Sequence, residues 1–395
     1  MGLIKGNFSF MQFSVEGQLP QAFNAFVSNR IKGNSYREAR NATEEKRMGW
    51  VSLTDILDAD FEGANYALGD YLIFSLRIDR KQISPKLMKV RLMEEQRKFL
   101  AEHEQTRIGK AMNEGIKDRV RLELMSKSDP VPSFYDVLWA VGQNKLYFSS
   151  LSDKVADDFV ELFKKTFSLN LVRILPQQHP AILKIKTQDN ADGADISSIG
   201  REFLTWLWFK SEERSGHIAL SKNEEVELHL LKRIVLEAGE GEYAQGVVCS
   251  GLHAELIEGK EAIRQGKKVK EACMRLLCDQ NEWEFHFKAD TFYFQSMKMP
   301  VKDWTESPED PSAALLERIY LIENAVKTMD KIYESFLSVR FSAKWTENEK
   351  AKLNQWLKRQ TGNRFDKKPF TNKIKSLNYS QHKSLKSFNN KPTTS

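Results

Sequence analysis

The chain has 395 residues, of which 41% are hydrophobic and 29% charged, and its formal net charge is +6. This ordinary globular usage excludes a largely disordered chain, and the length predicts two or three sub-structures rather than one hydrophobic core. The three cysteines argue against a disulfide framework, and the longest apolar run, residues 203–209, is too short to span a membrane. We therefore expect a soluble, intracellular protein.

The first part of the chain predicts a mixed α/β domain over residues 1–175. Residues 7–15 alternate between apolar and polar side chains, which indicates a strand, and residues 21–27 follow a proline as a helix. Residues 71–79 are rich in β-branched and aromatic side chains, which favours a second strand. Both strands carry enough apolar side chains to contribute to a core.

A long, charged helical region follows the second strand. Ser84 and Pro85 fit the cap and first turn of a helix. Further along, apolar residues recur at every fourth position and predict one apolar stripe, formed by Met112, Ile116, Val120 and Leu124. The two prolines of residues 129–132 end this region.

The next elements close the first domain. Residues 137–141 and 146–148, on either side of a Gly-containing turn, predict a β-hairpin, and residues 152–167 predict an amphipathic helix. The Pro- and Asp-rich composition of residues 176–198 indicates a linker, with one short strand at residues 181–185.

Residues 199–345 predict a second domain that is also mixed in structure. Its first element is a buried helix at residues 200–209, and its last is a helix with a broad apolar face at residues 313–336. Between these helices, strand-like runs suggest an antiparallel meander over residues 226–236, 246–249, 268–278, 283–287 and 292–297. The fold class expected is α+β, a mixed α/β build in which antiparallel sheets accompany long charged and amphipathic helices.

The remaining segment, residues 346–395, predicts a basic and largely disordered tail. Residues 351–395 contain eleven Lys or Arg and one acidic residue, so the excess positive charge of the chain lies here. Such a flexible arm tracks phosphates in some proteins and only increases solubility in others, and the sequence favours neither role.

No cofactor or metal site is expected. The sequence has no dinucleotide or phosphate-loop motif, and its seven histidines do not combine with Cys or Glu at zinc-ligand spacing. A nuclease would need carboxylates that converge on magnesium. The loose candidates are Asp153, Asp157, Asp158, Asp192, Asp195 and Glu202. For Asp153, a favourable position at a helix N-terminus is the simpler explanation.

Two basic clusters indicate contact with phosphates. The first consists of Lys81, Lys86, Lys89, Arg91, Arg97, Lys98, Arg107, Lys110, Lys117, Arg119, Arg121 and Lys127. Acidic residues interrupt it, so a solvated helix face with internal ion pairs is an equal alternative. The second consists of Arg264, Lys267, Lys268 and Lys270, which surround Gly266 where a helix is expected to give way to a strand.

Several of these segments, in the same order, make the chain similar to the RdgC family, the recombination-associated DNA-binding proteins of bacteria. The pieces that carry the resemblance are the opening strand, Met48-Gly49-Trp50-Val51, the strand 71–77 followed by Ile83-Ser84-Pro85, the charged helices ending Ile116-Lys117-Asp118-Arg119-Val120, the hairpin with Trp139, and residues 263–269. The likeness covers roughly residues 1–341. It implies a homodimer that forms a ring around duplex DNA, binds without sequence preference and restrains RecA-promoted strand exchange.

Two departures from the family accompany this resemblance. Typical members have a Pro-Arg-Ala-Phe segment whose aromatic residue forms a dimer contact, where this chain reads Met125-Ser126-Lys127-Ser128-Asp129-Pro130. The second half is also longer, with the helix at residues 200–209 and the basic tail as additions. The chain would therefore be a divergent branch of the family.

The leading hypothesis is a non-catalytic, cytoplasmic and nucleoid-associated protein that binds double-stranded DNA in recombination or replication. The alternatives are a metal-dependent exonuclease, a label the family has carried, and a protein-interaction scaffold whose basic tail only increases solubility. We predict no enzyme, because no catalytic constellation is evident in the sequence.

Overall fold

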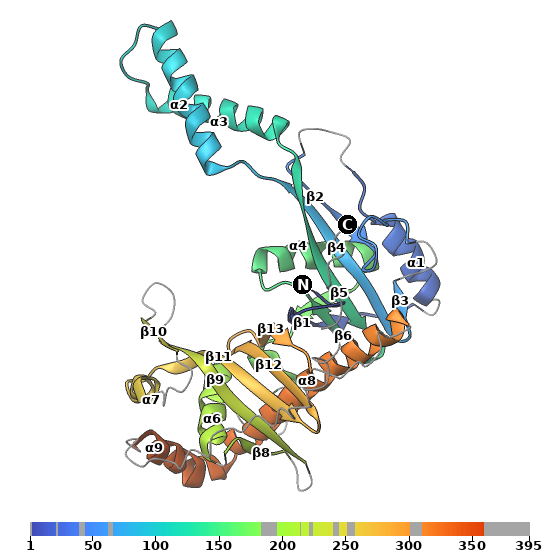
Figure 1. The fold of residues 1–395 in the computed structure, drawn as a ribbon, viewed down its shortest axis with the longest axis vertical. Helices are drawn as coiled ribbons and strands as arrows, with labels where there is room; N and C mark the ends of the chain where they lie inside the picture. Colours follow the sequence, from blue (N-terminus) through green and yellow to red (C-terminus); the bar gives the residue numbers. More distant parts are fainter. Residues whose placement is uncertain are drawn as a thin grey trace, which may run out of the picture. The chain divides into compact units, whose positions relative to one another are not determined.

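The computed structural model describes residues 2–20, 23–38, 44–61, 66–182, 196–213, 215–220, 224–239, 245–250, 257–300 and 310–358. The first half of the chain contains β1 (Phe8–Glu16), α1 (Phe23–Gly33), β2 (Lys46–Val51), β3 (Ala67–Leu68), β4 (Tyr71–Lys81), α2 (Pro85–Glu102), α3 (Lys110–Lys127), β5 (Pro130–Ala140), β6 (Lys145–Phe148), α4 (Asp153–Phe167) and β7 (Asn170–Arg173). The second half contains α6 (Ile199–Glu213), β8 (His217–Ala219), β9 (Glu225–Ala238), β10 (Gln245–Ser250), α7 (Ile257–Arg264), β11 (Lys268–Cys278), β12 (Asn281–Lys288), β13 (Tyr293–Lys298), α8 (Pro311–Arg340) and α9 (Lys350–Lys358). Figure 1 shows these elements.

The strands form a 13-stranded sheet in the order β10-β9-β11-β12-β13-β1-β6-β5-β4-β2, with β3, β7 and β8 paired alongside. The first strand, β1, joins the two halves of the chain. Its Phe10 lies opposite Phe294 of β13, and its Phe13 lies opposite Leu146 of β6, both in antiparallel register. The predicted α+β fold with antiparallel sheets is confirmed.

Helices cover the sheet because each presents a continuous apolar face. In α4 the buried side chains include Ala156, Phe159 and Phe163, and the Phe159 ring stacks on Phe148 of β6 with 4.0 Å between ring centroids. The long helix α8 runs past the strands of both halves (Figure 1), and its Glu323 accepts a hydrogen bond from the Tyr71 hydroxyl. One core therefore extends from the second half into the first.

The glycine of the Met48-Gly49-Trp50-Val51 block is required by close backbone packing. Trp50 N–H donates to Asn34 O, and Tyr36 N–H donates to Trp50 O, so residues 34–36 lie directly against β2. A Cβ atom at position 49 would lie 2.4 Å from the Tyr36 Cα atom. Only glycine lets the two backbones approach this closely.

We expect Gly49→Ala to lower the free energy of unfolding by about 1–3 kcal/mol, because the added methyl group must push residues 34–36 off the strand. Urea unfolding followed by tryptophan fluorescence measures the loss. Gly115→Ala is the control, because a Cβ there meets no atom within 4 Å and alanine favours a helix. Equal stability of Gly49→Ala and the native chain would contradict the packing argument.

Helices α2 and α3 form a hairpin, called the α2–α3 hairpin below, that connects the paired strands β4 and β5 (Figure 1). No residue of α2 is buried, and in α3 only Ile116 and Val120 are. The predicted apolar stripe is thus half correct, since the Met112 side chain remains 47% exposed. The seam between the helices also contains a hydrogen bond from the Gln96 amide to Asn113. Most of the hairpin surface therefore faces solvent.

Three predicted segments differ from the observed structure. Residues 180–182 are helical, so the strand predicted at residues 181–185 is wrong at its first two positions, and residues 183–195 lie outside the described residues. Residues 350–358 of the predicted arm form α9, because Trp356 and Leu357 are buried. The first predicted helix begins at Phe23 and extends to Gly33.

Candidate nucleic-acid interface

The α2–α3 hairpin exposes most of the first basic cluster. Residues 85–127 contain eleven Lys or Arg and seven acidic residues. Some of the cations pair within their own helix, as Arg91 does with Glu94 at 2.9 Å and Lys127 with Glu123 at 2.5 Å. Lys81 instead donates to Met125 O, which ties the end of β4 to the end of α3. These cations have partners and offer less to an external phosphate.

Other cations of the hairpin are exposed and have no such partner. Within the part of the chain that the structure describes, seven residues of the first basic cluster form no ion pair: Lys86, Lys89, Arg97, Arg107, Lys110, Lys117 and Arg119. Arg121 is 59% exposed and lies 3.8 Å from Glu45, at the outer limit of an ion pair. One part of the cluster is thus a solvated helix face with internal ion pairs. The other part carries positive charges that have no carboxylate partner.

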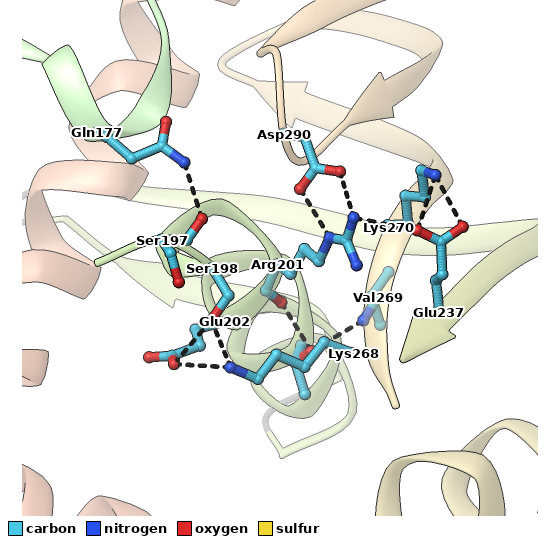
Figure 2. A network of polar contacts seen from close by, with 11 residues as sticks. Gln177, Ser197, Ser198, Arg201, Glu202, Glu237, Lys268, Val269, Lys270 and Asp290 are labelled. Carbon is cyan, nitrogen blue, oxygen red and sulfur yellow. Dashed lines mark hydrogen bonds and ion pairs between the residues drawn. The ribbon is translucent and has the colours of Figure 1, made fainter. Parts of the chain in front are cut away.

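Two residues of the second basic cluster, Lys268 and Lys270, lie in a network that the sequence did not predict, shown in Figure 2. The Arg201 guanidinium donates to both carboxylate oxygens of Asp290 at 2.7 Å and to Glu237 at 3.1 Å. Lys270 also pairs with Glu237, at 2.8 Å. Hydrogen bonding to Asp290 raises the pKa of Arg201 above its ordinary value. We call Arg201, Glu202, Glu237, Lys268, Lys270 and Asp290 the α6–β11 network.

The remaining cations of the second cluster differ in their surroundings. Lys268 pairs with Glu202 at 3.0 Å, and Arg264 donates to Leu357 O at the end of α9. Lys267 forms no ion pair among the described residues. Arg264 also pairs with Glu261, three residues away. The carboxylate partners of Lys268 and Lys270 lie 66 and 33 residues away along the chain, which is why the sequence did not reveal them.

The carboxylates considered for a nuclease also have cationic partners. Asp153 and Asp157 pair with Arg173, and Asp158 pairs with Lys46 and Arg80. Glu202 lies between Lys268 and Arg340, and Asp192 and Asp195 lie outside the described residues. Within the described residues, no group of three or more His, Cys, Asp or Glu side chains could hold a metal ion.

A buried charged triad at the base of the hairpin was also missed. The Arg77 guanidinium donates to both oxygens of Asp79, at 2.8 and 2.9 Å, and the Tyr36 hydroxyl donates to the same carboxylate at 2.7 Å. Burial and this hydrogen bond raise the pKa of Tyr36 to about 12. Arg77 and Asp79 share one face of β4, a two-residue spacing that the sequence did contain. The partner Tyr36 could not be identified without the fold.

None of the helices in the described residues is long and apolar enough to cross a membrane. Together, the fold and the exposed cations define a mixed α/β protein with a basic helical hairpin inserted between two strands. The sequence model of the family described as "Putative exonuclease, RdgC" matches residues 19–183, from just before α1 to beyond β7, and over this part the chain is similar to that family. No curated protein matches the chain.

The matched region contains the α2–α3 hairpin with its basic cluster but not the second basic cluster. The whole α2–α3 hairpin lies within residues 19–183, whereas the α6–β11 network and the basic tail lie entirely beyond them. The resemblance inferred from the sequence is thus confirmed over residues 19–183.

Proposed function

We propose that the protein binds double-stranded DNA without sequence preference through the α2–α3 hairpin. The observation that carries this proposal is the set of exposed cations on the hairpin without carboxylate partners. Lys110 and Lys117 lie seven residues apart on one helix face, so both can approach the same phosphate backbone. Lysine contacts to phosphate give affinity that falls with salt but do not read bases.

We also propose a role in recombination or replication, in which DNA binding restrains RecA-type strand exchange. The match to the RdgC family model over residues 19–183 supports this role, and a cytoplasmic, nucleoid-associated location would accompany it. The exposed apolar side chains of the hairpin, among them Val90 at 51% and Leu122 at 68%, support contact with a second copy in a ring-shaped homodimer. Residues 125–130, where the sequence lacks the family's aromatic residue, span the end of α3 and the start of β5.

The test is fluorescence anisotropy of labelled duplex DNA over a series of salt concentrations. We expect Lys86→Glu/Lys89→Glu/Lys117→Glu/Arg119→Glu to weaken binding roughly a hundredfold and to flatten the salt slope by about 3–4, because four phosphate contacts are lost. The charge-matched control reverses four exposed lysines of α1 and α4, Lys32, Lys154, Lys164 and Lys165. Equal losses in both variants, or native binding that ignores salt, would refute the proposal.

The family description makes an exonuclease the second candidate. We propose that the protein is not an enzyme, and this remains a prediction. Incubating end-labelled duplex with magnesium and the purified protein tests it. Degradation by the native chain that disappears in Asp153→Asn/Asp157→Asn would replace our proposal with the nuclease. If duplex binding is also absent, a protein-interaction scaffold becomes the better reading.

A further inference from the structure

A cavity of about 540 Å³ opens between the start of α6 and the start of β11. Its wall carries three cations, Arg201, Lys268 and Lys270, and two carboxylates, Glu237 and Asp290. Figure 2 shows Arg201 pointing toward Asp290 and Glu237, and Lys270 pointing toward Glu237. Lys268 points toward Glu202 instead. Glu202 is the carboxylate partner of Lys268, so the three cations are matched by three carboxylates with which an added anion must compete.

The ion pairs of this cavity are only partly shielded from water. Lys268 and Lys270 are 39% and 42% exposed, and Asp290 is 36% exposed. Ion pairs open to solvent contribute little stability, so a competing anion can exchange with them. Arg201 is more enclosed at 16%, and the two parallel hydrogen bonds it gives to Asp290 have the geometry with which arginine also binds a phosphate group.

We propose that this cavity is a phosphate site in which Glu237 and Asp290 act as internal competitors of the ligand. A phosphate group takes the place of the Asp290 carboxylate at Arg201, with Lys268 and Lys270 as further donors. The displaced carboxylates stay negatively charged nearby and repel the ligand, so binding in the native chain is weak. Removing the charges of Glu237 and Asp290 makes the site bind phosphate more tightly.

The phosphate can belong to the DNA backbone or to a free anion. The duplex case deepens the proposed function, on which it rests, because it adds a contact region outside the hairpin that is suppressed in the native chain. The free-anion case does not depend on DNA binding. The two sources are distinguished by using labelled duplex DNA and inorganic pyrophosphate as separate probes.

The experiment compares full-length Glu237→Gln/Asp290→Asn with the native chain, by anisotropy for the duplex and by calorimetry for pyrophosphate. We expect about tenfold tighter binding of at least one probe, since each lost carboxylate frees a charged donor. The control is Glu282→Gln/Glu284→Gln, which changes the net charge equally but removes the partners of Arg275 and Lys298, outside the cavity. Adding Lys268→Gln/Lys270→Gln should abolish the gain.

A folded double variant that binds both probes no more tightly than the control overturns the proposal. If the double variant does not fold, Asp290→Asn alone is used, because Arg201 keeps its pair with Glu237; a smaller gain is then expected, and no gain overturns the proposal. If the native chain fails to bind duplex DNA but the double variant binds pyrophosphate more tightly, the proposed function is rejected and the phosphate site in the cavity is supported.

Discussion

Asp79→Asn should lower the free energy of unfolding by about 3–5 kcal/mol, because it leaves the Arg77 guanidinium largely enclosed without a counter-charge. The Asp79 residue is 4% exposed, and the Arg77 guanidinium also packs over the Tyr36 ring, 3.9 Å from its centroid. Arg77 therefore cannot turn into solvent without losing this contact. Guanidinium chloride unfolding, followed by tryptophan fluorescence at pH 7, measures the loss.

The effect of Asp79→Asn should also depend on pH. Burial alone would raise the pKa of Asp79, but hydrogen bonds from Arg77 and Tyr36 outweigh it and lower the pKa below its ordinary value. A carboxyl whose pKa is lowered by folding stabilises the protein above its unfolded pKa, about 3.9, and loses this contribution as the pH falls through the folded value. The native and variant stabilities should therefore converge in acid.

The matched control for this prediction is Glu94→Gln, which removes an ion pair in which both partners are about half exposed. It should cost less than about 1 kcal/mol. A loss from Asp79→Asn no larger than this, or one that does not change with pH, would show that the triad contributes little to stability.

Phe10→Ala should destabilise both halves of the chain together, by about 3–5 kcal/mol. The Phe10 side chain is fully buried, with its ring 5.0 Å from that of Phe294 in β13 and 5.5 Å from that of Tyr147 in β6. Removing the ring opens a cavity where the core of the second half meets the strands of the first. The loss should therefore affect both sides of β1.

Scanning calorimetry tests this prediction and the predicted division into domains 1–175 and 199–345. We expect one unfolding transition, shifted to lower temperature as a whole. Two separate transitions, only one of which moves, would mean that the halves unfold independently. Leu57→Ala is the control, because that side chain is 81% exposed and its loss should change stability by less than about 0.5 kcal/mol.

Local patterns predicted the elements well. The 14-residue strand β9 and the 30-residue helix α8 were both expected, because their apolar periodicity is set by which face is buried. The order of strands was harder to predict. The meander is confirmed as antiparallel, but β9 pairs with both β10 and β11, which leaves β10 at the edge of the sheet. Nothing local in the sequence distinguishes an edge strand of this length from a central one.

The candidate site could be predicted only as a set of charges. The positions of the cations were evident, but whether each was free depended on partners brought near by the fold. Lys86 and Lys268 look alike in sequence, yet Lys86 is exposed on α2 while Lys268 meets Glu202 across 66 residues of chain. The opposite error arose for Asp79. Its alternation with Arg77 looks like the exposed polar face of a strand, yet the fold buries it.

The position of β1 between β6 and β13 has a consequence for how the chain folds. Ser9 of β1 accepts a hydrogen bond from the backbone of Ser296, and these residues are 287 positions apart. During synthesis, β1 can pair with β6 and β7 long before β13 has left the ribosome. Contacts at such separation form slowly, because a long loop must close first. Until that step, the start of β1, where Phe8 and Phe10 later pair with β13, would be open to strands of other chains. Early release or crowding during translation is therefore a route to aggregation.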